Sequence, residues 1–401
     1  MRSKWTTKDL GDIAEVTKLA GFEFTKYIEY TKEGEIIALR ALNLRNGKLD
    51  LTDIKRIHRN VSDSLVRSKL YINDILLTYT GNGYGDCAII SENDKYHLAP
   101  NICKITPNAE LVDAYYLYAY VRSYLFYQQM TSHIVGSGQP TIPMKTLRIL
   151  SVPIPNIETQ QKISSIISAF DEKIELNNKI NENLEQQAQA IFKSWFVDFE
   201  PWGGVCPEDW EQGCLLDIAD YLNGLAMQKY RPLDNEVGMP VLKIKELRRG
   251  SCDDSSDLCS SSIKSEYIIN NGDVIFSWSG SLLVDFWCGG TCGLNQHLFK
   301  VTSNKYDKWF YYSWTEFHLE RFIAVAADKA TTMGHIKRDE LKKAEVLIPS
   351  ERDYAKIGGL LEPIYEMIIS NKIENFRLSS LRDTLLPKLM SGEIDVSDIQ
   401  I

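Results

Sequence analysis

Hydrophobic and polar positions follow two different patterns along the 401-residue chain. Residues 156–200 and 351–401 place apolar residues at alternating steps of four and three, which is the spacing of a coiled-coil heptad. Residues 1–155 and 201–350, which precede these segments, contain short β-branched or aromatic runs closed by glycine and aromatic stretches with helical spacing. The pattern therefore predicts a mixed α/β (α+β) fold with two globular domains and two long coiled-coil helices.

The two predicted globular domains repeat each other in sequence, and the matching phrases keep the same order. The offset between matches falls smoothly from 205 through 199 to 194, as expected when only loops differ in length. Chance similarity would not keep this order, so we infer an internal duplication. The matched pairs are "WTTKDLGDIA" from Trp5 with "WEQGCLLDIA" from Trp210, "NDILLTYTG" from Asn73 with "GDVIFSWSG" from Gly272, and "TIPMKTLRILSVPIP" from Thr141 with "HIKRDELKKAEVLIP" from His335.

Local signals agree in the two copies. The phrases "DILLTYTG" and "DVIFSWSG" predict strands that enter tight turns at Gly81 and Gly280. The aromatic stretches after Asp113 and Asp307 predict helices with the aspartate as N-cap. Their aromatic residues are expected in the core rather than on a stacking platform.

Each long segment carries two asparagines in its apolar stripe, Asn177 and Asn181 in the first and Asn371 and Asn375 in the second. If the helices are antiparallel, Asn177 faces Asn375 and Asn181 faces Asn371. A buried asparagine layer costs stability but fixes register, because a slip leaves amides in an apolar seam. The alternative is that these asparagines point to solvent. Only Arg382 interrupts the stripe, and the neighbouring leucine at 381 can fill its place.

The helix pair also predicts a spatial arrangement. At 1.5 Å per residue, helices of this length form a rod of roughly 55 Å. An antiparallel pair would hold the two globular domains at opposite ends, related by a pseudo-two-fold axis. Six apolar residues at the helix ends would either stay exposed for docking partners or pack onto the domains: Trp195, Phe196, Phe199, Leu385, Leu386 and Leu389.

Charge and composition limit the kinds of partner. The net charge is −9, with +3 in residues 1–150 and negative totals elsewhere. Because no broad basic field exists, DNA binding would need local patches or a basic partner. The absence of a long apolar run and the polar start predict no membrane span and a cytoplasmic location. Cys288 and Cys292 lack a second ligand pair, so no metal is expected.

Motifs for catalysis are absent. The chain contains no NPP[YF] or DPPY phrase of amino-methyltransferases and no GxxxxGK[ST] phosphate loop. No histidine has a serine or cysteine partner that the sequence supports. The chain is therefore predicted not to be an enzyme.

Five phrases resemble the specificity subunits of Type I restriction-modification systems. The resemblance covers nearly the whole chain in the right order. One departure is "APNICKI" in the first copy where the second has "LNQHLFKV", which leaves Asn101 as its only polar remnant. The phrases are "GSGQPTIPMKTL" from Gly136, "IFKSWFVDFEP" from Ile191, "LNQHLFKV" from Leu294, "TTMGHIKRDEL" from Thr331 and "LRDTLLPKLMSGEIDV" from Leu381.

The resemblance implies a division of labour. Two target recognition domains would each read one half of a bipartite double-stranded DNA sequence. The long helices would dock two modification (methyltransferase) subunits, and restriction (motor-nuclease) subunits would join the complete enzyme. S-adenosylmethionine, ATP and magnesium would be bound by those partners, and this chain would carry no cofactor.

Polar and basic residues of the predicted loops suit base edges and phosphates. Positions that differ between the copies are expected to choose bases. We therefore expect residues 55–60 to form a specificity loop, because "DDSSDLCSSS" (253–262) occupies that stretch in the second copy. The candidates are Arg40, Arg45, Lys55, Arg56, His58, Arg59, Tyr79, Asn82, Tyr84, Gln139 and Lys145 in the first copy, and Lys243, Arg248, Arg249, Ser279, Ser281, His297, His335, Lys337 and Arg338 in the second.

A second hypothesis stays open. The chain could be a coiled-coil scaffold whose domains bind proteins and not DNA. Neither the target bases nor the spacing between half-sites can be read from the sequence.

Overall fold

The computed structural model of the chain describes residues 5–81, 83–134, 140–328 and 336–399. The chain divides into two compact units. Unit 1 contains residues 1–172 and 380–401, and unit 2 contains residues 173–379. Each unit therefore combines one globular domain with a part of both long helices.

The main sheet of unit 1 has four antiparallel strands in the order β2-β10-β7-β8. All four residues of β7 are buried, as its sequence "ILLT" predicts for a central strand. The helix α4 packs against β8. The strands are β2 (Ala14–Lys18), β10 (Ile102–Pro107), β7 (Ile75–Thr78) and β8 (Cys87–Ile89).

A second, three-stranded sheet of unit 1 has the order β6-β3-β9, and β3 is parallel to β9. Two short antiparallel pairs complete the strands, β1 with β11 and β4 with β5. The bounds are β6 (Lys55–Ile57), β3 (Ile36–Leu39), β9 (Tyr96–Leu98), β1 (Thr6–Asp9), β11 (Ser151–Ile154), β4 (Leu44–Arg45), β5 (Lys48–Leu49), α1 (Leu10–Ile13), α2 (Gly21–Tyr27), α3 (Arg59–Ser64), α4 (Ala114–Arg122), α5 (Tyr124–Thr131) and α6 (Met144–Arg148).

Unit 2 repeats this plan, in agreement with the predicted duplication. Its main sheet has the order β13-β20-β17-β18, its second sheet β15-β14-β19-β16, and β12 pairs with β21. Again one pair of the second sheet, β14 with β19, is parallel. The bounds are β13 (Asp220–Asn223), β20 (Leu298–Thr302), β17 (Asp273–Ser277), β18 (Leu283–Trp287), β15 (Leu258–Cys259), β14 (Met239–Leu242), β19 (Cys292–Leu294), β16 (Ile268–Ile269), β12 (Glu211–Cys214), β21 (Glu345–Ile348), α8 (Leu215–Ile218), α9 (Ile244–Arg249), α10 (Lys308–Phe317), α11 (Leu319–Asp328) and α12 (Arg338–Lys342).

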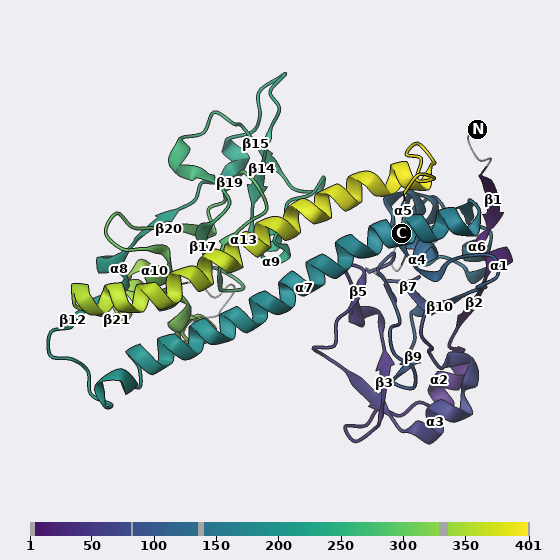
Figure 1. Cartoon of the computed structure of the whole chain (residues 1–401), viewed down its shortest axis with the longest axis horizontal. Coiled ribbons are helices and arrows are strands. Elements are labelled where there is room, and N and C mark those ends of the chain that lie inside the picture. Colours follow the sequence, from purple (N-terminus) through teal and green to yellow (C-terminus); the bar gives the residue numbers. More distant parts are fainter. Residues whose placement is uncertain (1–4, 82, 135–139, 329–335, 400–401) are drawn as a thin grey trace. The chain divides into compact units, whose positions relative to one another are not determined.

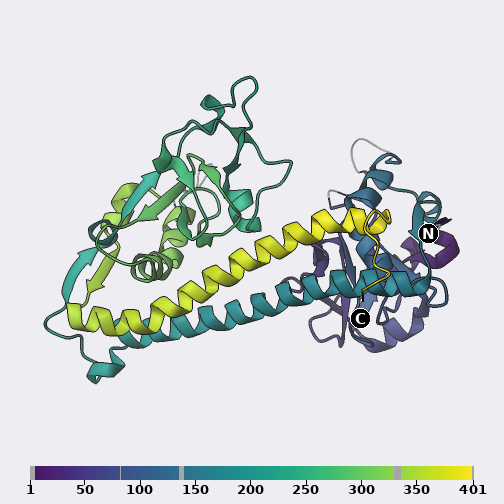
Figure 2. The ribbon, with the colours of Figure 1, turned by 45° about the horizontal axis from the view of Figure 1, so that its top comes forward.

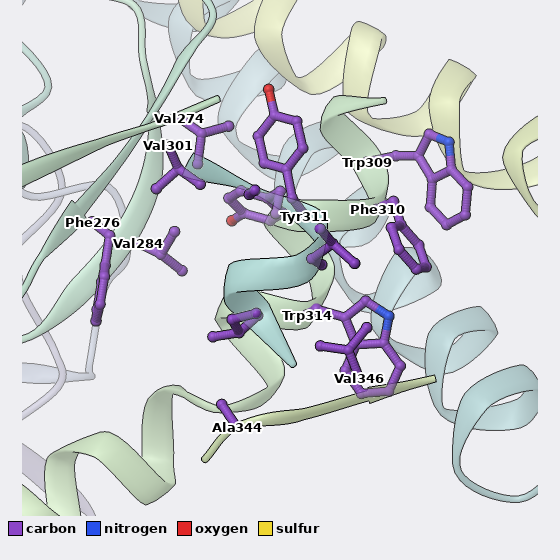
Figure 3. Close-up of a cluster of buried hydrophobic side chains, with 14 of the residues drawn as sticks. Val274, Phe276, Val284, Val301, Trp309, Phe310, Tyr311, Trp314, Ala344 and Val346 are labelled. Carbon is purple, nitrogen blue, oxygen red and sulfur yellow. The ribbon is translucent and has the colours of Figure 1, made fainter. Parts of the chain in front are cut away.

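The aromatic helices are core elements, as predicted. In unit 2, Trp309, Phe310, Tyr311 and Trp314 of α10 are buried in one hydrophobic cluster with the sheet residues Val274 and Val301, and Tyr311 lies on the side of these two valines (Figure 3). The equivalent α4 of unit 1 buries three tyrosines, Tyr116, Tyr118 and Tyr120. These rings fill the layer between sheet and helix.

The expected N-caps hold in only one copy. Asp113 accepts a hydrogen bond from the Tyr116 amide (2.9 Å), as an N-cap should. The Asp307 side chain makes no such cap. It accepts instead from the Tyr354 hydroxyl of the long helix (3.0 Å), which competes for the same carboxylate.

The long helices are α7 (Ile157–Phe196) and α13 (Glu351–Met390). They run side by side (Figures 1 and 2) and are antiparallel within each unit. In unit 2, Asn177 contacts Asn375 and Asn181 contacts Asn371, so residue numbers rise on one helix as they fall on the other. In unit 1, Arg382 of α13 contacts Asp171 of α7, and this pair continues the same antiparallel register.

Arg382 corrects one detail of the predicted seam. Its neighbour Leu381 is 52% exposed and does not fill the stripe. Arg382 itself stays in the seam, where its guanidinium donates to Asp171 Oδ1 (2.6 Å). The interruption of the apolar pattern is therefore an ion pair.

The apolar residues at the helix ends pack inside their own unit. Trp195 and Phe196 belong to the core of unit 2, with Phe199 partly buried against it. Leu386 and Leu389 belong to the core of unit 1, with a partly buried leucine at 385. The intramolecular alternative is thus correct, and these six residues form no exposed docking surface.

Among the described residues, no helix is long and apolar enough to cross a membrane. The cytoplasmic location expected from the sequence stays a prediction.

Candidate nucleic-acid interface

In unit 1, several elements meet beyond the end of β7. Across the main sheet Lys18 lies opposite Cys103, and Cys103 lies opposite Leu77. Two residues further along, the Tyr79 amide donates to the Asn101 carbonyl (3.3 Å), while the Tyr79 carbonyl accepts from an amide of the segment that leads into α6 (Ile142, 3.0 Å). The backbone at position 79 is therefore held from both sides.

Unit 2 holds the corresponding position in the same way. Asn223 lies opposite Phe299, which lies opposite Phe276. The Trp278 amide donates to the His297 carbonyl (3.4 Å), and the Trp278 carbonyl accepts from the amide of residue 336, which leads into α12 (2.9 Å). Tyr79 and Trp278 are thus structurally equivalent, although their side chains differ.

The side chains around these two positions also differ. In unit 1 the Lys18 ammonium lies 5.3 Å from the centre of the Tyr79 ring, within the range of a cation–π contact. In unit 2 the Trp278 indole N–H donates to Asn223 Oδ1 (2.9 Å), and the His297 ring lies 6.1 Å away. Lys18 and Asn223 are both exposed. The same backbone therefore presents an ammonium in one unit and an amide in the other.

Each unit also contains a lysine–aspartate pair that sequence analysis missed, buried in unit 1 and half-buried in unit 2. Lys104 Nζ lies 3.9 Å from Asp74 in unit 1, and Lys300 Nζ lies 2.9 Å from Asp273 in unit 2. Burial raises the pKa of Asp74, although hydrogen bonds from Thr106 and the backbone oppose this. The repeated phrases contain both residues, so their alignment could have identified the pairs. They join strands of the main sheets and are structural.

The four seam asparagines bond to each other in unit 2. Asn177 Nδ2 donates to Asn375 Oδ1 (2.9 Å), and Asn371 Nδ2 donates to Asn181 Oδ1 (2.8 Å). Three of the four are buried. Asn177 Oδ1 is buried without a hydrogen-bond partner. The layer is thus polar, largely enclosed and incompletely satisfied.

Comparisons with known proteins agree over nearly the full length. A family model described as Type I restriction modification DNA specificity domain matches residues 2–186 and 207–376. The chain belongs to this family. The MjaIX type I restriction enzyme specificity subunit of Methanocaldococcus jannaschii is 28% identical, with 98% of this chain and 94% of that protein covered. The EcoKI specificity subunit of Escherichia coli K12 is 23% identical, with 97% and 89% covered.

A solved structure supports the fold of the specificity subunit. The S subunit of a type I restriction-modification system from M. genitalium matches with a TM-score of 0.56 at 15% identity, covering 97% of this chain and 96% of that one. This chain is accordingly the DNA target specificity subunit of a type I system and is itself non-catalytic. Its two matched segments correspond to the two sequence repeats.

Several basic candidates of the specificity subunit are already paired with protein groups in unit 1. Arg40 donates to the Asp53 carbonyl (2.7 Å) and lies 3.2 Å from its carboxylate, with only 19% of its side chain exposed. Arg45 is 66% exposed, with Asp50 3.7 Å away. Lys145 is exposed in α6. Arg45 and Lys145 are therefore better placed for a ligand than Arg40.

The expected specificity loop at residues 55–60 is not a loop. Lys55, Arg56 and Ile57 form β6, which pairs with β3, and Arg59 begins α3. The segment also has a structural counterpart, because β15 pairs with β14 in unit 2. Arg56 is half-buried and donates to the Gly34 carbonyl (3.3 Å), whereas Lys55, His58 and Arg59 are exposed.

In unit 2 the candidates separate in the same way. Lys243 pairs with Asp257 (2.5 Å), Arg249 pairs with Asp253, and Ser279 is buried. Ser281 and His297 are half-buried. Arg248, Lys337 and Arg338 are exposed, the last two where α12 begins. The candidates Asn82, Gln139 and His335 lie outside the described residues.

Tyr84 is half-buried beside the turn that follows β7. Its ring stacks on Tyr127 of α5 at 5.7 Å, and the two hydroxyls are 3.2 Å apart. This hydrogen bond, with burial, raises the pKa of Tyr127 to about 12. Tyr84 is thus fixed by a neighbour, whereas Tyr79 reaches toward Lys18.

No cluster of three or more metal-ligating side chains occurs within the described ranges. In this family the cofactors belong to the partner subunits.

Proposed function

We propose that this specificity subunit reads a bipartite double-stranded DNA target, with one half-site for each globular domain, and positions two methyltransferase subunits on it. Restriction subunits would join the same assembly, and S-adenosylmethionine, ATP and magnesium would be bound by the partners. The observation that carries the proposal is the repeated strand-end arrangement, in which one backbone frame presents Lys18 and Tyr79 in unit 1 and Asn223 and Trp278 in unit 2.

Exposed basic side chains support the DNA-facing role of these strand ends. Lys145 lies in α6, and Lys337 and Arg338 lie at the start of α12. Each helix follows the segment whose amide bonds to the residue at the strand end. Such side chains suit phosphates and would position the domain on the duplex. The acidic total of the chain makes help from a basic partner expected.

Footprinting tests the bipartite reading. The full chain, alone and with its methyltransferase subunits, is incubated with duplex DNA that contains a site found by methylome sequencing of a host carrying the system. We expect protection of two short segments about one helical turn apart, since both domains must reach the same face of the duplex. Absence of protection while the methyltransferase subunits still bind would favour the alternative of a protein scaffold.

Arg59→Ala tests the first domain at the start of α3. Because Arg59 is exposed, its loss should leave the fold intact and weaken binding to the first half-site roughly tenfold if it contacts a base. Competition assays with targets altered in one half-site at a time measure this. Arg56→Ala is the comparison, since it also removes a hydrogen bond to Gly34 and should lower stability. An equal loss on non-specific DNA would instead identify Arg59 as a phosphate contact.

A further inference from the structure

We infer, building on the proposed function, that residues 18 and 79 in unit 1 and their equivalents 223 and 278 in unit 2 determine which base is read at one position of each half-site. None of Lys18, Asn223 and Trp278 stood out in the sequence as a DNA contact. Their equivalence comes from strand register and from the matched backbone hydrogen bonds at Tyr79 and Trp278.

The first argument is that the backbone hydrogen bonds at the two strand ends are the same, whereas the side chains differ. At both strand ends an amide and a carbonyl of one residue are held by the same two neighbouring segments. The backbone therefore has little freedom to differ between units. A subunit that reads two different half-sites needs different base contacts from two similar domains. A shared backbone conformation that carries different side chains provides such contacts.

The second argument is the chemistry of the exchanged groups. An ammonium has three donors and no acceptor, so Lys18 suits the O6 and N7 acceptors of guanine. A carboxamide has both donor and acceptor groups and suits adenine, so Asn223 favours a different base. The indole of Trp278 orients Asn223 by donating to its Oδ1, and the Tyr79 ring lies beside the Lys18 ammonium. Each aromatic ring is therefore a positioning group.

The third argument is exposure. Lys18 and Asn223 are exposed at the ends of β2 and β13, while Tyr79 and Trp278 are half-buried behind them. The Asp74–Lys104 pair is buried against the main sheet of unit 1, and the Asp273–Lys300 pair is half-buried against that of unit 2. The lysine–aspartate pairs that both units share therefore lie within the main sheets, whereas the residues that differ, Lys18 and Asn223, lie exposed at the strand ends.

An exchange variant tests the inference. Lys18→Asn with Tyr79→Trp gives unit 1 the groups of unit 2. Asn101 is left unchanged, so that its left-handed backbone (φ 73°) keeps its native residue. The full chain, in complex with its methyltransferase subunits, is used to select from a library of duplex DNAs with randomised sequence. We expect the preference for guanine at one position of the first half-site to fall at least roughly tenfold, with the second half-site unchanged.

Matched variants make each outcome decisive. Lys8→Asn removes the same charge from β1 of unit 1 and should leave both half-sites unchanged. The reciprocal Asn223→Lys with Trp278→Tyr should alter only the second half-site, and it decides the question if the first variant does not fold. Wild-type protein that selects no sequence overturns the proposed function itself. Wild-type selection with unchanged preferences in both exchange variants, or a uniform loss on all DNA, overturns this inference alone.

Discussion

Replacing Asp171 with asparagine should destabilise unit 1 by about 3–5 kcal/mol, because it leaves two largely buried guanidinium groups without their shared counter-charge. Arg122 donates to Asp171 Oδ2 (2.8 Å) and Arg382 to Oδ1 (2.6 Å). Tyr115 donates a third hydrogen bond to Oδ2. The ionic side chains keep only 14–18% of their surface exposed. Urea unfolding followed by circular dichroism, with hydrogen exchange of α4, measures the loss.

The same carboxylate makes the loss depend on pH. Burial alone would raise the pKa of Asp171, but the Arg122 charge, hydrogen bonds from Arg122 and Tyr115 and the Arg382 charge hold it below its usual range. A lowered folded-state pKa stabilises the protein above the unfolded value, about pH 4, and this contribution is lost as pH falls through the folded value. The difference between wild type and Asp171→Asn should therefore be full at pH 7 and shrink in acid.

Glu172→Gln is the control for Asp171→Asn. Glu172 is the next residue on α7 and is exposed, so the change should alter stability by less than about 0.5 kcal/mol. If Asp171→Asn behaved like this control at pH 7, the ion cluster would contribute nothing to the fold.

Sequence periodicity could predict the helices but not this cluster. The heptad pattern places Arg382 in the seam, yet its partner is 211 residues away and the third member, Arg122, comes from α4. An interruption in an apolar stripe shows that something polar is buried and does not show what pairs with it. For the same reason the pattern alone favoured a leucine at 381, which is exposed.

The candidate DNA contacts were harder to predict than the fold. Arg40, Lys243 and Arg249 are attractive as basic residues, but each pairs with an aspartate that lies further along the chain, at position 53, 257 and 253 respectively. Residues 55–57 form a strand too short to show an alternating pattern, so the segment resembled a loop. By contrast, the sequence repeat correctly predicted that the two units contain the same strands. Matched phrases such as those around Tyr79 and Trp278 form the same backbone hydrogen bonds in both units.

Replacing Asn177, Asn181, Asn371 and Asn375 together with leucine should stabilise unit 2 by roughly 2–4 kcal/mol and loosen the pairing of α7 with α13. The gain arises because buried amides are replaced by apolar groups, and because Asn177 Oδ1 is enclosed without a partner at a cost of about 1–3 kcal/mol. Register should loosen because a shifted leucine seam no longer leaves polar groups unpaired.

Two measurements separate stability from register in this quadruple variant. Thermal unfolding should show a higher Tm, while spin labels on unnatural amino acids at the exposed positions Lys179 and Arg377 should report a broader distance distribution. Asn183→Leu, an exposed asparagine on the same helix, controls for general effects of leucine and should change neither. A lower Tm in the quadruple variant would mean that the asparagine bonds are worth more than the burial of four leucines. In that case the layer would stabilise the helix pair, and an apolar seam would not be its more stable alternative.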